Sequence, residues 1–195
     1  MADKRSGVSR RDVLRGAGAA ALFGAVSGVE AQERPGSLVR VGPGAARIPL
    51  TVNGRRTVLE VEPRVTLLDA LRDHAGLTGP KRICDRGACG GCTVWVDGKT
   101  VNSCMMLAID AAGHAVTTIE GLAQNGKLHP VQAAFVKHDA MQCGFCTPGM
   151  IMSCTALVES NKNPTPAEIR EAVSGNLCRC GVYPHVFAAV KEVAR

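Results

Sequence analysis

The sequence predicts an α+β protein of two small domains, a strand-rich one followed by a helical one. Two turn dipeptides, Asn53-Gly54 and Asp97-Gly98, separate runs rich in β-branched residues, which is the pattern of two-residue hairpins. After Pro130 the apolar residues recur at helical spacing. Each half also carries its own group of four cysteines, and a chain of 195 residues is long enough for two small domains.

Residues 1–31 are predicted to be a twin-arginine export signal. The run Ser9–Leu14, Ser-Arg-Arg-Asp-Val-Leu, resembles that signal, and a mildly apolar stretch follows over Gly16–Val29. The stretch is shorter than the about 20 apolar residues of a membrane-spanning helix and fits a signal h-region. Cleavage after Ala31 is expected to leave a periplasmic chain with no membrane span. A disordered basic tail is the alternative interpretation of this segment.

A flexible leader is expected over residues 32–46, which are rich in turn-forming residues. The strand-rich domain is then expected over residues 47–122. Leu67, Leu68 and Leu71 give its helix an apolar stripe. In chain order the expected elements are the hairpin strands Ile48–Val52 and Thr57–Val61, a helix capped by Thr66, the hairpin strands Thr93–Val96 and Thr100–Ser103, and a strand near Ala115–Ile119.

The helical domain is expected over residues 123–195 and to contain four short helices. Three are predicted to begin at or beside Pro130, Pro148 and Pro184, because the missing N–H of proline costs nothing in the first helical turn. The remaining helix follows Thr165, whose side chain and that of Glu168 are spaced as a capping box. Four helices of this length form a small bundle.

Eight of the nine cysteines fall into two arrays with the spacings Cys-x4-Cys-x2-Cys-x11-Cys and Cys-x2-Cys-x31-Cys-x-Cys. The first array is Cys84, Cys89, Cys92 and Cys104, and the second array is Cys143, Cys146, Cys178 and Cys180. The first spacing is that of a plant-type ferredoxin, in which four thiolates hold a [2Fe–2S] cluster. Such a cluster is a redox centre, so the pattern predicts electron transfer.

Glycines near the first array support a metal-binding loop. Gly87, Gly90 and Gly91 lie between or beside its cysteines. Glycine permits positive φ angles and close approach of the backbone, so several amide N–H groups could point at sulfur. Such hydrogen bonds stabilise the reduced, more negative cluster.

Other uses of the cysteines stay open at this point. Zinc accepts four thiolates, and the second array alone could hold it, whereas the first lacks the two short cysteine pairs of a zinc knuckle. Disulfides suit an oxidising compartment, but an odd cysteine count and Cys-x-Cys spacing favour a shared metal centre. The ninth cysteine, Cys154, is expected to be a small apolar core residue. The five histidines show no paired metal spacing and are expected to be surface or packing residues.

The net charge of +6 does not indicate a nucleic-acid partner. Five of the basic residues belong to the predicted export signal, and the rest form no Lys/Arg stripe interleaved with aromatic side chains. Nucleic-acid binding is therefore not expected.

The residues around the second array resemble the second iron–sulfur domain of the xanthine oxidase family of molybdenum hydroxylases. They run MQCGFCTPGM over Met141–Met150 and GNLCRC over Gly175–Cys180. The first array, from Cys84 to Val94, is similar to the ferredoxin-like domain of that family, and the resemblance spans residues 47–195. With its export signal, the chain looks like the small subunit of a periplasmic aldehyde oxidoreductase. It departs from the family in Ile83, where glycine is frequent, and after Cys180, where Gly-Val-Tyr replaces Thr-Gly-Tyr.

The resemblance implies a β-grasp plant-type ferredoxin domain followed by a four-helix-bundle domain, with one [2Fe–2S] cluster in each. It implies a large partner subunit that holds a molybdenum–pterin cofactor close to the second array. Gln142 would contact the pterin, and Cys180 would contact it besides ligating iron. Electrons would leave one at a time through both clusters for FAD on a further subunit or for an external acceptor such as a cytochrome.

The resemblance also implies that the substrate, an aldehyde or an N-heterocycle, is oxidised on the large subunit. No residue of this chain is therefore expected to be catalytic. A free two-cluster electron carrier is the alternative function. A zinc-stabilised binding module is the third, and it predicts a colourless protein.

Overall fold

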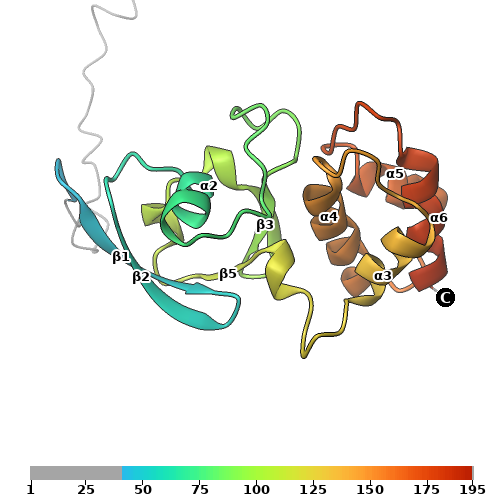
Figure 1. Cartoon of the computed structure of the whole chain (residues 1–195), viewed down its shortest axis with the longest axis horizontal. Coiled ribbons are helices and arrows are strands. Elements are labelled where there is room, and N and C mark those ends of the chain that lie inside the picture. Colours follow the sequence, from blue (N-terminus) through green and yellow to red (C-terminus); the bar gives the residue numbers. More distant parts are fainter. Residues whose placement is uncertain (1–40, 195) are drawn as a thin grey trace, which may run out of the picture. The chain divides into compact units, whose positions relative to one another are not determined.

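The structure is a computed structural model that describes residues 41–194 of the chain. The predicted export signal and residues 32–40 of the predicted leader lie outside the described residues. Residues 41–194 belong to one compact unit, in which a strand-rich half is followed along the chain by a helical half (Figure 1). Among the helices of residues 41–194, none has the length and apolar character needed to cross a membrane.

A mixed five-stranded sheet forms the strand-rich half, with strand order β2-β1-β5-β3-β4. The strands are β1 (Ala46–Val52), β2 (Arg55–Val61), β3 (Thr93–Val96), β4 (Lys99–Asn102) and β5 (Ala115–Thr117). Both predicted hairpins are confirmed, since β1 pairs antiparallel with β2 and β3 with β4. Asn53 and Asp97 open the two turns with φ values of 50° and 47°, as such turns require. The first strand begins at Ala46, two residues before its predicted start.

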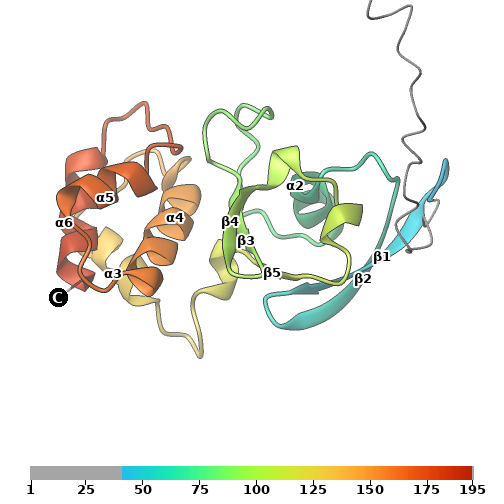
Figure 2. The ribbon, with the colours of Figure 1, turned by 180° about the vertical axis from the view of Figure 1, so that it is seen from behind.

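Strand β5 joins the two hairpins into one sheet. It runs parallel to β1 and antiparallel to β3. The sheet buries apolar side chains against the segment that follows β2, including Leu67 and Leu71, which are fully buried. Figure 2 shows this segment beside the sheet from the opposite side.

The helix predicted after Thr66 begins where it was expected, but most of it is a π-helix rather than an α-helix. The Thr66 hydroxyl accepts a hydrogen bond from the Asp69 N–H at 3.1 Å, as the cap prediction requires. Helix α2 (Leu67–Asp69) is only one turn long and continues as a π-helix over Ala70–His74. The wider turn ends with the Ala75 N–H donating to the Ala70 carbonyl at 3.0 Å. Single π-turns of this kind are rare and cannot be read from apolar spacing.

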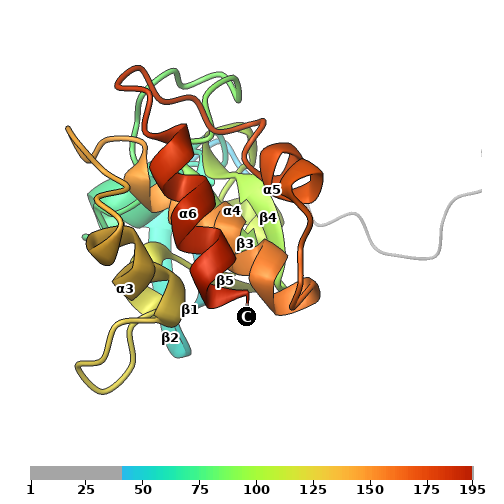
Figure 3. The same cartoon turned by 90° about the vertical axis from the view of Figure 1, so that its right-hand side faces the viewer.

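The four predicted helices of the second half are confirmed. They are α3 (Pro130–Lys137), α4 (Thr147–Ser160), α5 (Pro166–Ala172) and α6 (Tyr183–Val193). The capping box of Thr165 and Glu168 is present at the start of α5, and His129 and Gln132 form a second one at α3 that the sequence analysis missed. Figure 3 shows α6 in front of α4, with α3 and α5 at the sides. Phe135, Met150 and Val186 are fully buried between these helices.

Helix α4 also packs against β3, so the two halves share one interface (Figure 1, Figure 2). The indole Nε1–H of Trp95 on β3 donates to the Met152 carbonyl on α4 at 3.1 Å. Trp95 is 8% exposed and packs within the apolar core of the helices rather than that of the sheet. The sheet therefore contributes a side chain to the helical core, and this fixes the loops at the ends of β3 and α4 relative to each other.

Candidate metal centres

The first array lies in the loop before β3 and in the turn after β4. Cys92 ends the loop directly before β3, and Cys104 lies in a short 3-10 turn, Ser103–Met105, directly after β4. The Ser103 hydroxyl donates to the Cys92 carbonyl at 2.7 Å. Because the β3–β4 hairpin reverses the chain after Asp97-Gly98, it returns Cys104 to the neighbourhood of Cys92. The hairpin thus builds half of the site.

The thiols of the first array form two close pairs. Cys84 has Cys89 as its thiol neighbour, and Cys104 has Cys92. The backbone N–H of Arg86, together with the Cys89 thiol, lowers the pKa of Cys84 to about 7. Burial and the nearby Cys92 raise the pKa of Cys104 to about 11. A buried thiol that resists ionisation needs a positive metal centre to become the thiolate that binds iron.

Backbone amides of the loop point at these sulfurs, as the glycine pattern predicted. The Gly87 N–H donates to the Cys104 Sγ at 3.3 Å, and Gly87 and Gly90 have φ values of 71° and 67°. Gly91 has a second role besides supplying a backbone hydrogen bond to the Cys89 sulfur. A Cβ at Gly91 would lie 2.3 Å from the Ile83 side chain, so Gly91 leaves room for the residue that departs from the family pattern.

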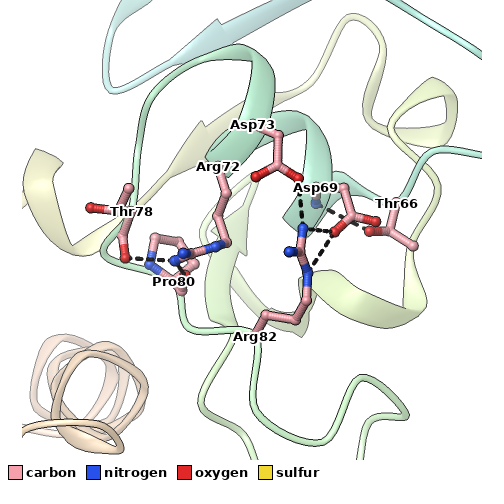
Figure 4. Close-up of polar contacts among 7 residues, drawn as sticks. All are labelled: Thr66, Asp69, Arg72, Asp73, Thr78, Pro80 and Arg82. Atoms are coloured by element: carbon pink, nitrogen blue, oxygen red, sulfur yellow. Dashed lines mark hydrogen bonds and ion pairs between the residues drawn. The ribbon is translucent and has the colours of Figure 1, made fainter.

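Two arginines form hydrogen bonds that hold the segment leading into Cys84 in place (Figure 4). Arg72 on the π-helix donates through Nη1 to the carbonyls of Thr78 and Pro80 at 2.9 and 2.8 Å. Arg82 donates to the carboxylates of Asp69 and Asp73, with 2.7 Å to Asp73. The helical segment after Thr66 therefore holds the chain on the approach to the first array. The sequence did not indicate this network, because arginine spacing alone does not reveal carbonyl partners.

The second array joins the start of α4 to the loop between α5 and α6, as predicted. Cys146 is the N-cap residue of α4, with Cys143 just before it, and Cys178 and Cys180 precede α6. The Sγ atoms of Cys143 and Cys180 are 3.6 Å apart, and Cys146 has Cys178 as its thiol neighbour. Cys143 and Cys180 are exposed, whereas Cys146 is buried and its pKa is raised by burial to about 12.

The paired thiols fit a two-iron cluster. The Sγ atoms of Cys143 and Cys180 are separated by 3.6 Å, close to the about 3.8 Å between two thiolates that lie about 2.3 Å from one tetrahedral metal ion. A [2Fe–2S] cluster needs two such pairs, one for each iron, and all-thiolate donors. Each array supplies four thiols and no other donor, and Cys143 and Cys180 have the separation expected of two ligands on one iron, so the residues present match this group in donor chemistry.

A backbone hydrogen bond connects the two arrays. The Leu177 N–H donates to the Cys89 carbonyl at 2.9 Å, and Leu177 is bonded directly to Cys178. The Tyr183 hydroxyl accepts from the Cys178 N–H at 2.9 Å and donates to the Asn176 carbonyl at 3.0 Å. The loop that carries Cys178 is thereby held against the loop that carries Cys89. No sequence signal pointed to either contact.

Gln142, Cys154 and two of the five histidines also have clear positions in the structure. Gln142 is exposed beside Cys143. Cys154 is fully buried among the helices, and burial raises its pKa to about 12, which confirms it as a core residue. His129 caps α3, and His138 pairs with Glu192 across α3 and α6, so these two histidines serve packing and capping.

Known protein families match both halves of the chain. The family described as "2Fe-2S iron-sulfur cluster binding domain" matches residues 50–118, and "[2Fe-2S] binding domain" matches residues 118–191. The chain is 41% identical over 204 aligned residues to the aldehyde oxidoreductase iron-sulfur-binding subunit PaoA of Escherichia coli (strain K12), covering 96% of this chain and 88% of that protein. Both domain matches name [2Fe–2S] clusters, and neither supports the zinc interpretation that the second array left open.

Two solved structures extend the comparison. Quinoline 2-oxidoreductase from Pseudomonas putida 86 has a chain with a TM-score of 0.75 and 45% identity, covering 78% of this chain and 94% of that one. The aldehyde oxidoreductase of Desulfovibrio desulfuricans ATCC 27774 has a TM-score of 0.73 and 41% identity over 76% of this chain, but only 17% of its own longer chain. With both domains and nearly its whole length matched, the chain belongs to the family of [2Fe–2S] small subunits of molybdenum hydroxylases.

Proposed function

We propose that the eight array cysteines ligate two [2Fe–2S] clusters and that this subunit relays electrons one at a time. The observation that carries the proposal is the pair of thiol arrays joined by the hydrogen bond from the Leu177 N–H to the Cys89 carbonyl. A [2Fe–2S] cluster supplies a one-electron redox couple. The residues of this chain hold two such couples close together and supply amide donors to their sulfurs.

The second array is proposed to face the molybdenum–pterin cofactor of the large subunit. Its outer thiols, Cys143 and Cys180, are exposed, and Gln142 is exposed next to them. An exposed amide can donate and accept hydrogen bonds at the edge of a pterin, and an exposed thiolate can accept one. The first array is proposed to deliver electrons to FAD on a further subunit or to an external acceptor such as a cytochrome.

Aldehydes are the proposed substrates of the complex, ahead of N-heterocycles. PaoA, an aldehyde oxidoreductase subunit by name, matches 96% of this chain, including part of residues 1–40, which precede both domain matches. An aldehyde that takes up the oxygen of water releases two electrons and two protons as it becomes a carboxylic acid. That oxidation is assigned to the large subunit, so this chain has a transfer role and no catalytic residue.

The complex is proposed to be periplasmic, with export of this chain by the twin-arginine route. Residues 1–31 carry the signal pattern, and a match covering 96% of the chain includes part of residues 1–40. In the test, a double substitution, Arg10→Lys with Arg11→Lys, should leave the tagged chain in the cytoplasmic fraction. An unchanged periplasmic fraction would refute the export proposal without affecting the electron-transfer proposal.

Purification through a carboxyl-terminal tag tests the subunit assignment. The expected result is a complex with a large subunit and stoichiometric molybdenum, in which added aldehyde bleaches the visible absorption of the clusters. A monomer with full iron content and no partner would instead identify a free electron carrier. Bleaching by quinoline but not by aldehydes would reassign the substrate class alone.

A further inference from the structure

Asn176 forms a buried polar bridge between the two halves of the molecule. Its side-chain Oδ1 accepts a hydrogen bond from the Ser153 hydroxyl on α4 at 2.8 Å. Its Nδ2 donates to the carbonyl of Gly90, in the loop of the first array, at 3.0 Å. Asn176 is 3% exposed, and it lies two residues before Cys178. One side chain thus contacts α4 and the first array while its backbone belongs to the second.

Two glycines allow this close approach. A Cβ at Gly90 would lie 2.5 Å from the Nδ2 of Asn176, and a Cβ at Gly149 on α4 would lie 2.0 Å from the Gly90 carbonyl oxygen. Neither distance is possible between real atoms, so any larger residue would push the halves apart. The Gly90 carbonyl also accepts from the Thr93 hydroxyl at 2.7 Å, which fixes its direction.

The side-chain bridge and the backbone bond act on neighbouring residues. Asn176 donates to Gly90 through its side chain, and the next residue, Leu177, donates to Cys89 through its N–H. The two bonds run side by side between the same two loops. A pair of adjacent hydrogen bonds fixes both separation and rotation, whereas one bond would leave a pivot.

We propose that Asn176 is the positioning residue that sets the distance and register of the two arrays, and thereby the rate of electron exchange between them. This inference rests on the proposed electron-transfer function. Only a carboxamide suits the position, because the side chain must accept from the Ser153 hydroxyl and donate to the Gly90 carbonyl. An aspartate would set an oxygen against that carbonyl, and an apolar residue would leave both buried groups unsatisfied.

The test uses the whole complex carrying Asn176→Asp, Asn176→Ala or Ser153→Ala. Ser174→Ala is the matched control, because this exposed residue in the same loop donates its hydroxyl hydrogen bond to the Glu171 carbonyl of the preceding helix, α5, and not to the first array. The first readout is the magnetic splitting between the electron paramagnetic resonance signals of the two fully reduced clusters, which reports their separation. The second is the rate of electron redistribution between the clusters, followed by rapid freezing after substrate is added.

Both Asn176 variants should keep two cluster signals but show a changed splitting and exchange that is slower by about tenfold, because small displacements of reacting groups have large kinetic effects. Ser153→Ala should show a smaller change in the same direction, and Ser174→Ala none. If the Asn176→Ala protein binds no iron, the Asn176→Asp and Ser153→Ala proteins provide the test of the positioning role. Wild-type splitting and rate in these variants would overturn the positioning role. A wild-type protein lacking two clusters would instead overturn the proposed function.

Discussion

The N–H of Leu177 donates to the carbonyl of Cys89 at 2.9 Å, although Leu177 is 56% exposed. The residue therefore contributes to the link between the arrays through its backbone, while its side chain faces outward. Phe145, next to Cys146, is also exposed, at 53%. Each apolar residue directly precedes a cysteine of the second array, on the side proposed to face the large subunit.

Truncating these two side chains should weaken assembly without affecting the clusters. For Phe145→Ala and Leu177→Ala we expect binding of the large subunit to weaken by about tenfold each, since fully burying a Leu or Phe side chain is worth about 1.5–3 kcal/mol and about 1.4 kcal/mol is a factor of ten in affinity. Val136→Ala is the control, because Val136 is 62% exposed but lies on α3, away from any array cysteine. Affinity is measured by titrating the isolated subunits. Wild-type affinity in both Phe145→Ala and Leu177→Ala would show that this surface lies outside the interface.

A methyl group at Gly149 should disturb the contact between α4 and the first array. Its Cβ would meet the Gly90 carbonyl oxygen at 2.0 Å, and overpacking of this kind costs about 1–3 kcal/mol. Gly149→Ala should lower the thermal unfolding midpoint by several degrees and reduce the iron retained on purification. Gly175→Ala is matched to it, since nothing lies within 4 Å of a Cβ there. An equal fall in midpoint and in retained iron for Gly149→Ala and Gly175→Ala would contradict the steric explanation.

Arg72 should be needed to hold the approach to the first array. Arg72→Met removes the donor to the Thr78 and Pro80 carbonyls, and hydrogen bonds from charged groups contribute about 1.5–3 kcal/mol. We expect faster loss of iron to a chelator from the first array while the signal of the second persists. Arg64→Met serves as control, because the Arg64 side chain is 85% exposed and pairs only with nearby Glu62. Equal loss from both arrays would argue against a local role.

His129 should make stability depend on pH. Burial lowers the pKa of His129 below its ordinary 6.5, and the neutral ring accepts a hydrogen bond from the Val131 N–H at the start of α3. Since the folded pKa lies below the unfolded one, this stabilisation is complete above about pH 6.5 and is lost as the pH falls through the folded value.

The matched variant is His129→Asn, which keeps a capping side chain but does not titrate. Between pH 7 and pH 5 the wild type should lose up to about 1 kcal/mol more stability than the variant, seen as a fall in thermal midpoint larger by about 2–4 °C. Parallel pH dependence of the two proteins would exclude His129 as the source.

Local patterns in the sequence predicted the elements well, because they depend on residues a few positions apart. The turn dipeptides, the Thr66 cap and the Thr165 capping box each involve neighbours in the chain, and each is present. The cysteine spacing likewise indicated two sites, and the structure gathers each array into two thiol pairs.

The contacts that set the two sites in place could not be predicted in this way. Asn176 and Gly90 are separated by 86 positions, and Trp95 and Met152 by 57. Such pairs depend on how α4 packs against β3, which no short pattern encodes. The π-helix after Asp69 was not predicted either, because apolar spacing does not distinguish it from an α-helix: Ala70 and Leu71 are buried against the sheet as an α-helical stripe would be.

Electron paramagnetic resonance of the dithionite-reduced complex, with metal analysis of the same sample, tests the central claim most directly. Two distinct [2Fe–2S] signals and about four iron atoms per chain are expected. Cys89→Ser should abolish one signal and Cys146→Ser the other, whereas Cys154→Ala should keep both. A sample that contains zinc and gives no signal, or a single signal that survives both serine variants, would contradict the account.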